Sequence, residues 1–144
     1  MKLIIKDKEM DQKEWFVYDE ANQPVYTVRW VEEDLLLFDR DGNEIGKAIR
    51  EEAQLPKYQL SCQENKGVIE KCFSISYPKY ELSFGQYRIE GNCGNWNFSV
   101  YEACSVAAGL KPSEEGIQLQ AVTKEAAELA ILVLATIDKG NKSH

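Results

Sequence analysis

The sequence predicts a mainly β fold, namely a twelve-stranded closed β-barrel threaded by an apolar carboxyl-terminal helix. Two observations lead to this prediction. Short runs rich in Val, Ile, Tyr, Phe and Trp recur between turn residues up to about residue 121, as in sandwiches and barrels built of hairpins. At Thr123 the pattern changes abruptly to a run of helix formers that is almost entirely apolar.

The predicted strands are short, and most of them alternate in hydrophobicity. In Gln86–Gly91 and Trp96–Tyr101 the apolar residues recur at every second position, which is the period of a half-buried strand. The twelve candidates are Lys2–Lys6, Glu14–Tyr18, Val25–Trp30, Asp34–Phe38, Glu44–Arg50, Lys57–Cys62, Gly67–Ile75, Lys79–Phe84, Gln86–Gly91, Trp96–Tyr101, Cys104–Ala108 and Gly116–Val122.

Turn residues separate these strands at regular intervals. Gly, Asn, Asp and Pro supply positive φ or a restricted φ at Asn22–Pro24, Asp41–Asn43, Asn65–Gly67 and Asn92–Asn95. The segments around Asp19 and Asp39 resemble each other, either as an internal repeat or because hairpins look alike. The residues from Asp39 superficially match a calcium-binding loop, but that loop needs Gly where Glu44 stands. We therefore interpret them as a hairpin turn.

The final segment, Lys124–Asp138, predicts one helix. Thr123 is expected to cap its amino end and Gly140 its carboxyl end. Almost every residue from Leu129 to Ile137 is apolar, so the helix must be surrounded by protein or by lipid. About 14 residues would span only ~21 Å, less than the ~30 Å of a bilayer core. The helix is therefore expected to fill the interior of a wide barrel.

The chain is expected to form one domain over residues 1–139, followed by a short polar tail at 140–144. The amino terminus has only a brief apolar run, too short for a secretory signal. We therefore expect a cytoplasmic protein that is not transmembrane. The net charge of −7 disfavours nucleic acid as a partner, because phosphate backbones attract basic surfaces.

Catalytic and metal-binding patterns are not found in the sequence. The single histidine is His144, the last residue, and Cys62, Cys72, Cys93 and Cys104 lack the spacing of a zinc or redox motif. They are expected to be reduced cysteines of the core or strands. We therefore predict a protein that is not an enzyme, with no catalytic residues, no metal and no cofactor.

Five segments, in their order along the chain, carry a resemblance to a known family: 16–19, 25–28, 38–45, 55–58 and 129–138. They resemble the LURP-one-related family, whose fold is similar to the tubby carboxyl-terminal domain. The resemblance covers roughly residues 15–139 and implies a twelve-stranded barrel around a central helix. Tubby-like domains bind phosphoinositide headgroups and the related scramblases act at membranes, although the basic residues of the tubby site cannot be matched here.

Two functions follow as hypotheses. The first is a non-enzymatic domain that binds anionic phospholipid headgroups at a membrane surface. The alternative is a protein–protein interaction or scaffold module with no small-molecule ligand, and a lipocalin-like carrier ranks last because its helix should keep a polar face. The candidate anion-binding residues come from the one mildly basic stretch and are Lys57, Lys66, Lys71, Lys79 and Arg88.

Overall fold

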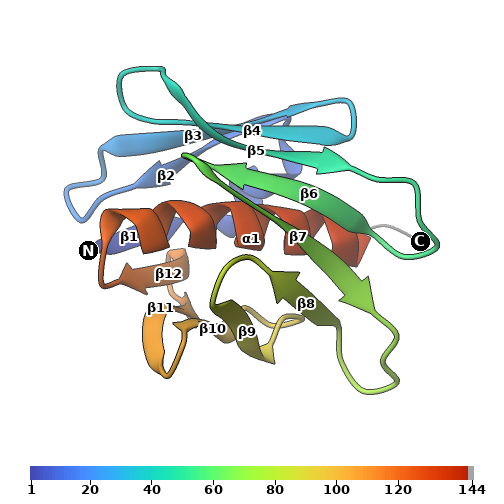
Figure 1. Cartoon of the computed structure of the whole chain (residues 1–144). Coiled ribbons are helices and arrows are strands. Elements are labelled where there is room, and N and C mark those ends of the chain that lie inside the picture. Colours follow the sequence, from blue (N-terminus) through green and yellow to red (C-terminus); the bar gives the residue numbers. More distant parts are fainter. Residues whose placement is uncertain (143–144) are drawn as a thin grey trace.

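One antiparallel sheet of twelve strands wraps around a single α-helix in this computed structural model, which describes residues 1–142 (Figure 1). The elements are β1 (Lys2–Ile5), the 3₁₀ helix η1 (Asp7–Asp11), β2 (Glu14–Tyr18), β3 (Pro24–Val31), β4 (Asp34–Phe38), β5 (Glu44–Arg50), β6 (Lys57–Cys62), β7 (Asn65–Cys72), β8 (Lys79–Ser83), β9 (Tyr87–Asn92), β10 (Asn97–Glu102), β11 (Ser105–Ser113), β12 (Gly116–Ala121) and α1 (Lys124–Lys142).

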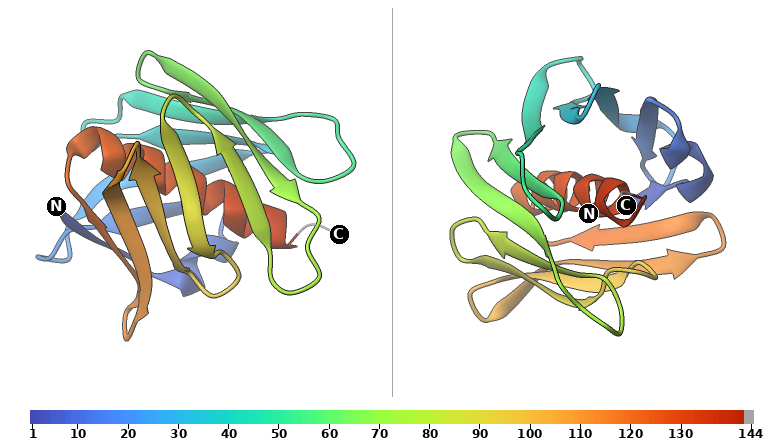
Figure 2. Two further views of the ribbon diagram at one scale, coloured as in Figure 1. Left: turned by 60° about the horizontal axis from the view of Figure 1, so that its bottom comes forward. Right: turned by 90° about the vertical axis from the view of Figure 1, so that its right-hand side faces the viewer.

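The sheet closes almost completely around the helix (Figure 2). Each strand pairs with its neighbours in sequence except across the β8–β9 connection, and β1 also pairs with β12, which joins the two halves. The edges of the sheet are β8 and β9, and in the turn between them Phe84 and Tyr87 form an isolated antiparallel bridge. The predicted fold class is thereby confirmed, and the barrel is nearly closed, with a seam between β8 and β9.

The helix is surrounded on all sides, as its composition predicts. Every residue from Ala126 to Asp138 is buried, including the polar Glu128 and Thr136. Thr123 caps the amino end, where its Oγ1 accepts a hydrogen bond of 3.1 Å from the backbone N–H of Ala126. None of the described helices is long and apolar enough to cross a membrane.

The end of the helix differs from the prediction. Gly140 does not terminate α1, which continues to Lys142 and has 19 residues. A Cβ atom added to Gly140 would lie 3.1 Å from the ring of Tyr80. This glycine is therefore needed for close packing against β8, and the expected role as a helix cap is wrong. Of the predicted polar tail, residues 143–144, including His144, lie outside the described residues.

Two strand ends differ from the sequence prediction by three residues or more, and one element was not predicted. β7 ends at Cys72 instead of Ile75, so Phe73 and Ile75 belong to a loop. β11 extends to Ser113, well beyond the predicted end at Ala108. The 3₁₀ helix η1 was not predicted, because it is short and polar and buries a single side chain, that of Met10.

The central packing of the helix predicts the effect of a truncation. Leu132 is fully buried and faces Gly46 of β5, where an added Cβ would lie 2.8 Å from Leu132 Cδ1. Leu132→Ala should lower the free energy of unfolding by about 2–5 kcal/mol, because it leaves a cavity in the barrel axis. Urea denaturation measures this change. Val122→Ala, at a side chain that is 73% exposed, is the control and should shift stability by no more than about 0.5 kcal/mol.

Candidate functional site

Successive strands run in opposite directions, so the connections between them lie alternately at the two ends, or rims, of the barrel. We call the end around the last turn of α1 the carboxyl rim; it is formed by residues 7–11, 32–33, 51–56, 73–78, 93–96 and 114–115. The opposite end, where α1 begins, is the amino rim, formed by residues 19–23, 39–43, 63–64, 84–86 and 103–104. Since the helix fills the interior, these rims and the outer face are the surfaces left for recognition.

Three of the five predicted anion-binding residues lie together at the carboxyl rim. Lys57 begins β6, opposite Glu70 of β7. Lys71 lies near the end of β7 and Lys79 begins β8, opposite Cys72. The backbone N–H of Lys71 also donates a hydrogen bond of 2.8 Å to the carbonyl of Pro56, so the segments that hold these lysines are neighbours.

The other two candidates lie at the amino rim. Lys66 follows the β6–β7 turn, five residues before Lys71, which places the two about 16 Å apart along the strand. Arg88 lies near the start of β9, where it forms an ion pair of 3.5 Å with Glu90 and stacks over the ring of Tyr101. The structure therefore divides the five residues between two ends of the barrel and does not form one patch from them.

The three lysines of the carboxyl rim differ in their contacts. The Nζ of Lys57 lies 3.4 Å from a carboxylate oxygen of Glu51, an ion pair that is partly exposed. The Nζ of Lys71 donates a hydrogen bond of 3.2 Å to the carbonyl of Gly140 and so interacts with the negative end of α1. The Nζ of Lys79 lies over the ring of Tyr77. Lys57 and Lys79 are the better placed of the three to contact a ligand.

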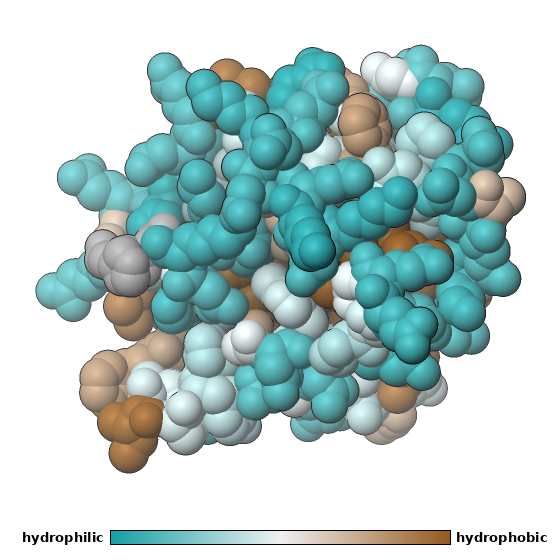
Figure 3. Space-filling model, turned by 180° about the vertical axis from the view of Figure 1, so that it is seen from behind, coloured by the Kyte–Doolittle hydropathy of each residue, from teal (hydrophilic) through white to brown (hydrophobic). Residues whose placement is uncertain are grey.

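An uncharged loop projects between Lys71 and Lys79. Phe73 is 84% exposed, Ile75 93% and Tyr77 38%. Serines alternate with these side chains, and Pro78 ends the loop. The loop extends from the barrel in Figure 1, and the view from behind shows apolar surface at the corresponding corner (Figure 3). Sequence reasoning missed this feature because it assigned Phe73 and Ile75 to a strand.

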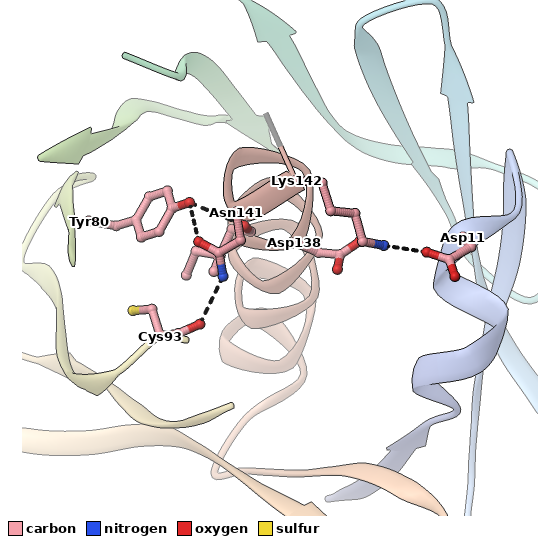
Figure 4. A network of polar contacts seen from close by, with 7 residues as sticks. Asp11, Tyr80, Cys93, Asp138, Asn141 and Lys142 are labelled. Carbon is pink, nitrogen blue, oxygen red and sulfur yellow. Dashed lines mark hydrogen bonds and ion pairs between the residues drawn. The ribbon is translucent and has the colours of Figure 1, made fainter. Parts of the chain in front are cut away.

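The base of this loop is attached to the end of the helix (Figure 4). The hydroxyl of Tyr80 in β8 lies 2.7 Å from Oδ1 of Asn141 and 3.2 Å from the carbonyl of Ile137. The Nδ2 of Asn141 donates a hydrogen bond of 3.1 Å to the carbonyl of Cys93, in the turn after β9. Asn141 thus connects the two sides of the seam, and β8 is held close to α1 where the loop begins.

A second set of polar contacts lies on the other side of the helix end. The Nζ of Lys142 donates to Asp11 of η1 at 2.6 Å and to Asp138 at 3.0 Å. Burial disfavours the charge of Lys142, but these hydrogen bonds outweigh it and raise the pKa of its ammonium group. Burial raises the pKa of Asp138, and Lys142 opposes that shift. These contacts tie the last turn of α1 to η1.

The amino rim contains a buried carboxylate. Glu128 is 2% exposed and accepts hydrogen bonds from the Tyr26 hydroxyl at 2.8 Å and from Gln63 Nε2 at 2.6 Å. Burial, followed by the bond to Glu128, raises the pKa of Tyr26. Because both partners of Glu128 come from the barrel wall, this network serves to attach the helix to β3 and the β6–β7 turn.

A hollow of about 360 Å³ lies on the same rim, lined in part by Asp19, Asp39, Asp41 and Lys124. The carboxylates of Asp19 and Asp39 each accept two backbone N–H bonds of 2.9 Å within their own turns. The backbone N–H of Asn43 is the largest influence that lowers the pKa of Asp39. Asp19 and Asp39 thus stabilise their own hairpin turns, and the residues from Asp39 form a turn, as the sequence predicts. Within residues 1–142, no three or more His, Cys, Asp or Glu side chains are placed so that they could hold one metal ion.

Comparison with known proteins assigns the family. The model of the LURP-one-related family matches residues 1–130. The chain belongs to the LURP-one-related family. An X-ray structure of a protein from Arabidopsis thaliana is similar in fold, with a TM-score of 0.62 and 13% sequence identity over 97% of this chain and 90% of the other. Among curated proteins none matches this chain.

The seam network predicts a stability effect. Tyr80→Phe removes the hydroxyl that bonds Asn141 Oδ1 and the carbonyl of Ile137 at the end of α1. The free energy of unfolding should fall by about 1–3 kcal/mol, as measured by urea denaturation. Tyr77→Phe, in the exposed loop, is the matched control and should have little effect. Equal stability of the two variants would contradict the proposed importance of the network.

The four free cysteines should differ in reactivity. Burial raises the pKa of the Cys62 and Cys93 thiols to about 12, whereas Cys104 is exposed. Because the thiolate is the reactive form, iodoacetamide at about pH 8 should modify Cys104 first and leave Cys62 and Cys93 unmodified until the protein unfolds. Peptide mass spectrometry with and without urea measures this order. Rapid modification of Cys62 in the folded protein would show that its surroundings are more open.

Proposed function

We propose that this protein is a non-enzymatic, peripheral domain of the cytoplasm that binds anionic phospholipid headgroups through its carboxyl rim. The observation that supports the proposal most is the proximity of Lys57, Lys71 and Lys79, which come from three different strands, to a projecting loop that has no acidic residue. Lysine ammonium groups are suited to phosphate as point charges.

The overall charge of −7 does not exclude such binding. Part of this charge lies on the carboxyl rim itself, where residues 7–11, 32–33, 51–52 and 114–115 contain nine acids. Exposed charges that lie farther from the loop than the Debye length, about 8 Å at physiological ionic strength, are largely screened. The charges nearest the membrane therefore dominate. Residues 71–80, around the loop, contain Lys71 and Lys79 and no Asp or Glu.

The chemistry of the buried polar groups favours a binding role over catalysis. Glu128 is occupied by two hydrogen bonds. The Cys62 thiol, which is near it, has its pKa raised to about 12 by burial and is a poor nucleophile at neutral pH. The described groups with strongly shifted pKa values thus lie in the packed interior and contribute to structure.

Vesicle co-sedimentation of paired variants tests the proposal. The protein should bind vesicles rich in phosphoinositide and not vesicles of phosphatidylcholine alone, and binding should weaken as salt increases from about 0.1 M to about 1 M. Each lysine contributes about 1 kcal/mol near an anionic surface. The double variant K57Q/K79Q should therefore lose affinity by up to roughly 30-fold.

The control is K66Q/R88Q, which makes the same change of charge at the amino rim. It should bind nearly as well as the unchanged protein. No binding to phosphoinositide vesicles at low salt would refute the proposal and favour a protein-interaction module. An equal loss in both double variants would refute the assignment to the carboxyl rim.

A further inference from the structure

The exposed loop at residues 73–78 has a composition that folding does not explain. Phe73 and Ile75 are 84% and 93% exposed, so they contribute almost nothing to the core. Leu55, in the neighbouring loop of the same rim, is also exposed. Large apolar side chains gathered at a projecting tip are typical of surfaces that contact a partner or a membrane.

The loop is supported by a rigid base. Its first strand, β7, is held to the helix end by the bond from Lys71 to Gly140, and its second strand, β8, by the bonds of Tyr80. The side chains of Phe73 and Ile75 are thereby presented from a fixed scaffold, and little chain entropy would be lost on binding.

The small size of this apolar tip and the absence of acidic residues from its loop favour a lipid bilayer over a protein. Three exposed side chains supply much less than the roughly 800 Å² that each partner buries in a stable protein–protein interface. An apolar tip with lysines beside it is suited to the boundary between headgroups and acyl chains. Lys71 and Lys79 border the loop, and no acidic residue lies between them.

We propose that Phe73 and Ile75 insert into the acyl-chain boundary of the membrane while the lysines of the carboxyl rim contact the headgroups. This inference rests on the proposed function and adds to it a second, salt-resistant component of binding. It also sets an orientation, in which the carboxyl end of α1 faces the membrane and the amino rim faces away.

Substitution of the two apolar residues tests the insertion. The protein should retain part of its binding to phosphoinositide vesicles at about 1 M salt, where electrostatic attraction is screened. F73S/I75S should lose about tenfold or more of the affinity that remains at high salt, since each buried Phe or Ile favours the apolar phase by more than a factor of ten. Binding at low salt should fall less.

The matched control is V106S/V122S, which replaces two exposed aliphatic residues near the amino rim and should bind like the unchanged protein. A direct measurement uses Ile75→Trp, whose emission should shift to shorter wavelength with phosphoinositide vesicles and be quenched by brominated acyl chains. The native Trp15 and Trp30 are buried, but Trp96 is only partly buried and lies on the carboxyl rim, so both tryptophan variants are made with Trp96→Phe. Val122→Trp should show neither effect.

The outcomes separate the two proposals. If F73S/I75S binds like the unchanged protein at both salt concentrations, or if the emission of Ile75→Trp does not respond to vesicles, insertion is refuted and headgroup binding by lysine stands. If the unchanged protein binds no vesicles at low salt, both proposals are refuted. Loss of the salt-resistant component in F73S/I75S alone, together with the shifted emission, supports insertion.

Discussion

The structure depends on one constraint: a 19-residue helix whose middle turns are almost entirely apolar on all sides must be enclosed by protein. A single layer of helix or sheet against one face would leave the other faces in water. The sheet must therefore curve around the whole circumference, and twelve short strands achieve this. Where Leu132 of the helix packs against β5, the strand has room only for a residue without a side chain. Gly46 of β5 has no room for a Cβ beside Leu132, so here the helix packs directly on the strand backbone.

The polar last turn of the helix bridges the seam that the strands leave between β8 and β9. The edges of the sheet, β8 and β9, share a bridge near their turn instead of a full ladder, and unpaired strand edges expose backbone groups. Asn141 spans this seam, since its amide accepts from Tyr80 and donates to Cys93. The extension of α1 beyond Gly140 is what brings Asn141 to this place. The helix thus fills the core with its middle and joins the barrel edges with its last turn.

Alternation of hydrophobicity predicted the strands well, and its failures have a physical reason. The bounds of β2, β4, β5 and β6 were predicted to the residue, because in each of them buried and more exposed side chains alternate. In Phe73-Ser74-Ile75 the same alternation continues past the end of β7, and a period of two does not reveal whether its apolar side faces the core or water. Gly140 was misread for a similar reason: packing against Tyr80, which no local pattern encodes, determines that residue.

Which of the basic residues lie together could be decided only from the topology of the sheet. The composition alone identified five candidates in one stretch, but strand direction decides which of them meet. Lys71 and Lys79 are eight positions apart and lie on opposite sides of one connection, whereas Lys66 and Lys71 are closer in sequence and lie toward different rims. Because the interior is full, recognition is confined to the rims and outer face. At the amino rim, Asp19 and Asp39 are used within their own turns. Phe73 and Ile75 of the apolar loop are almost fully exposed and add little to the core, and a feature that local folding rules do not require is where function is to be sought.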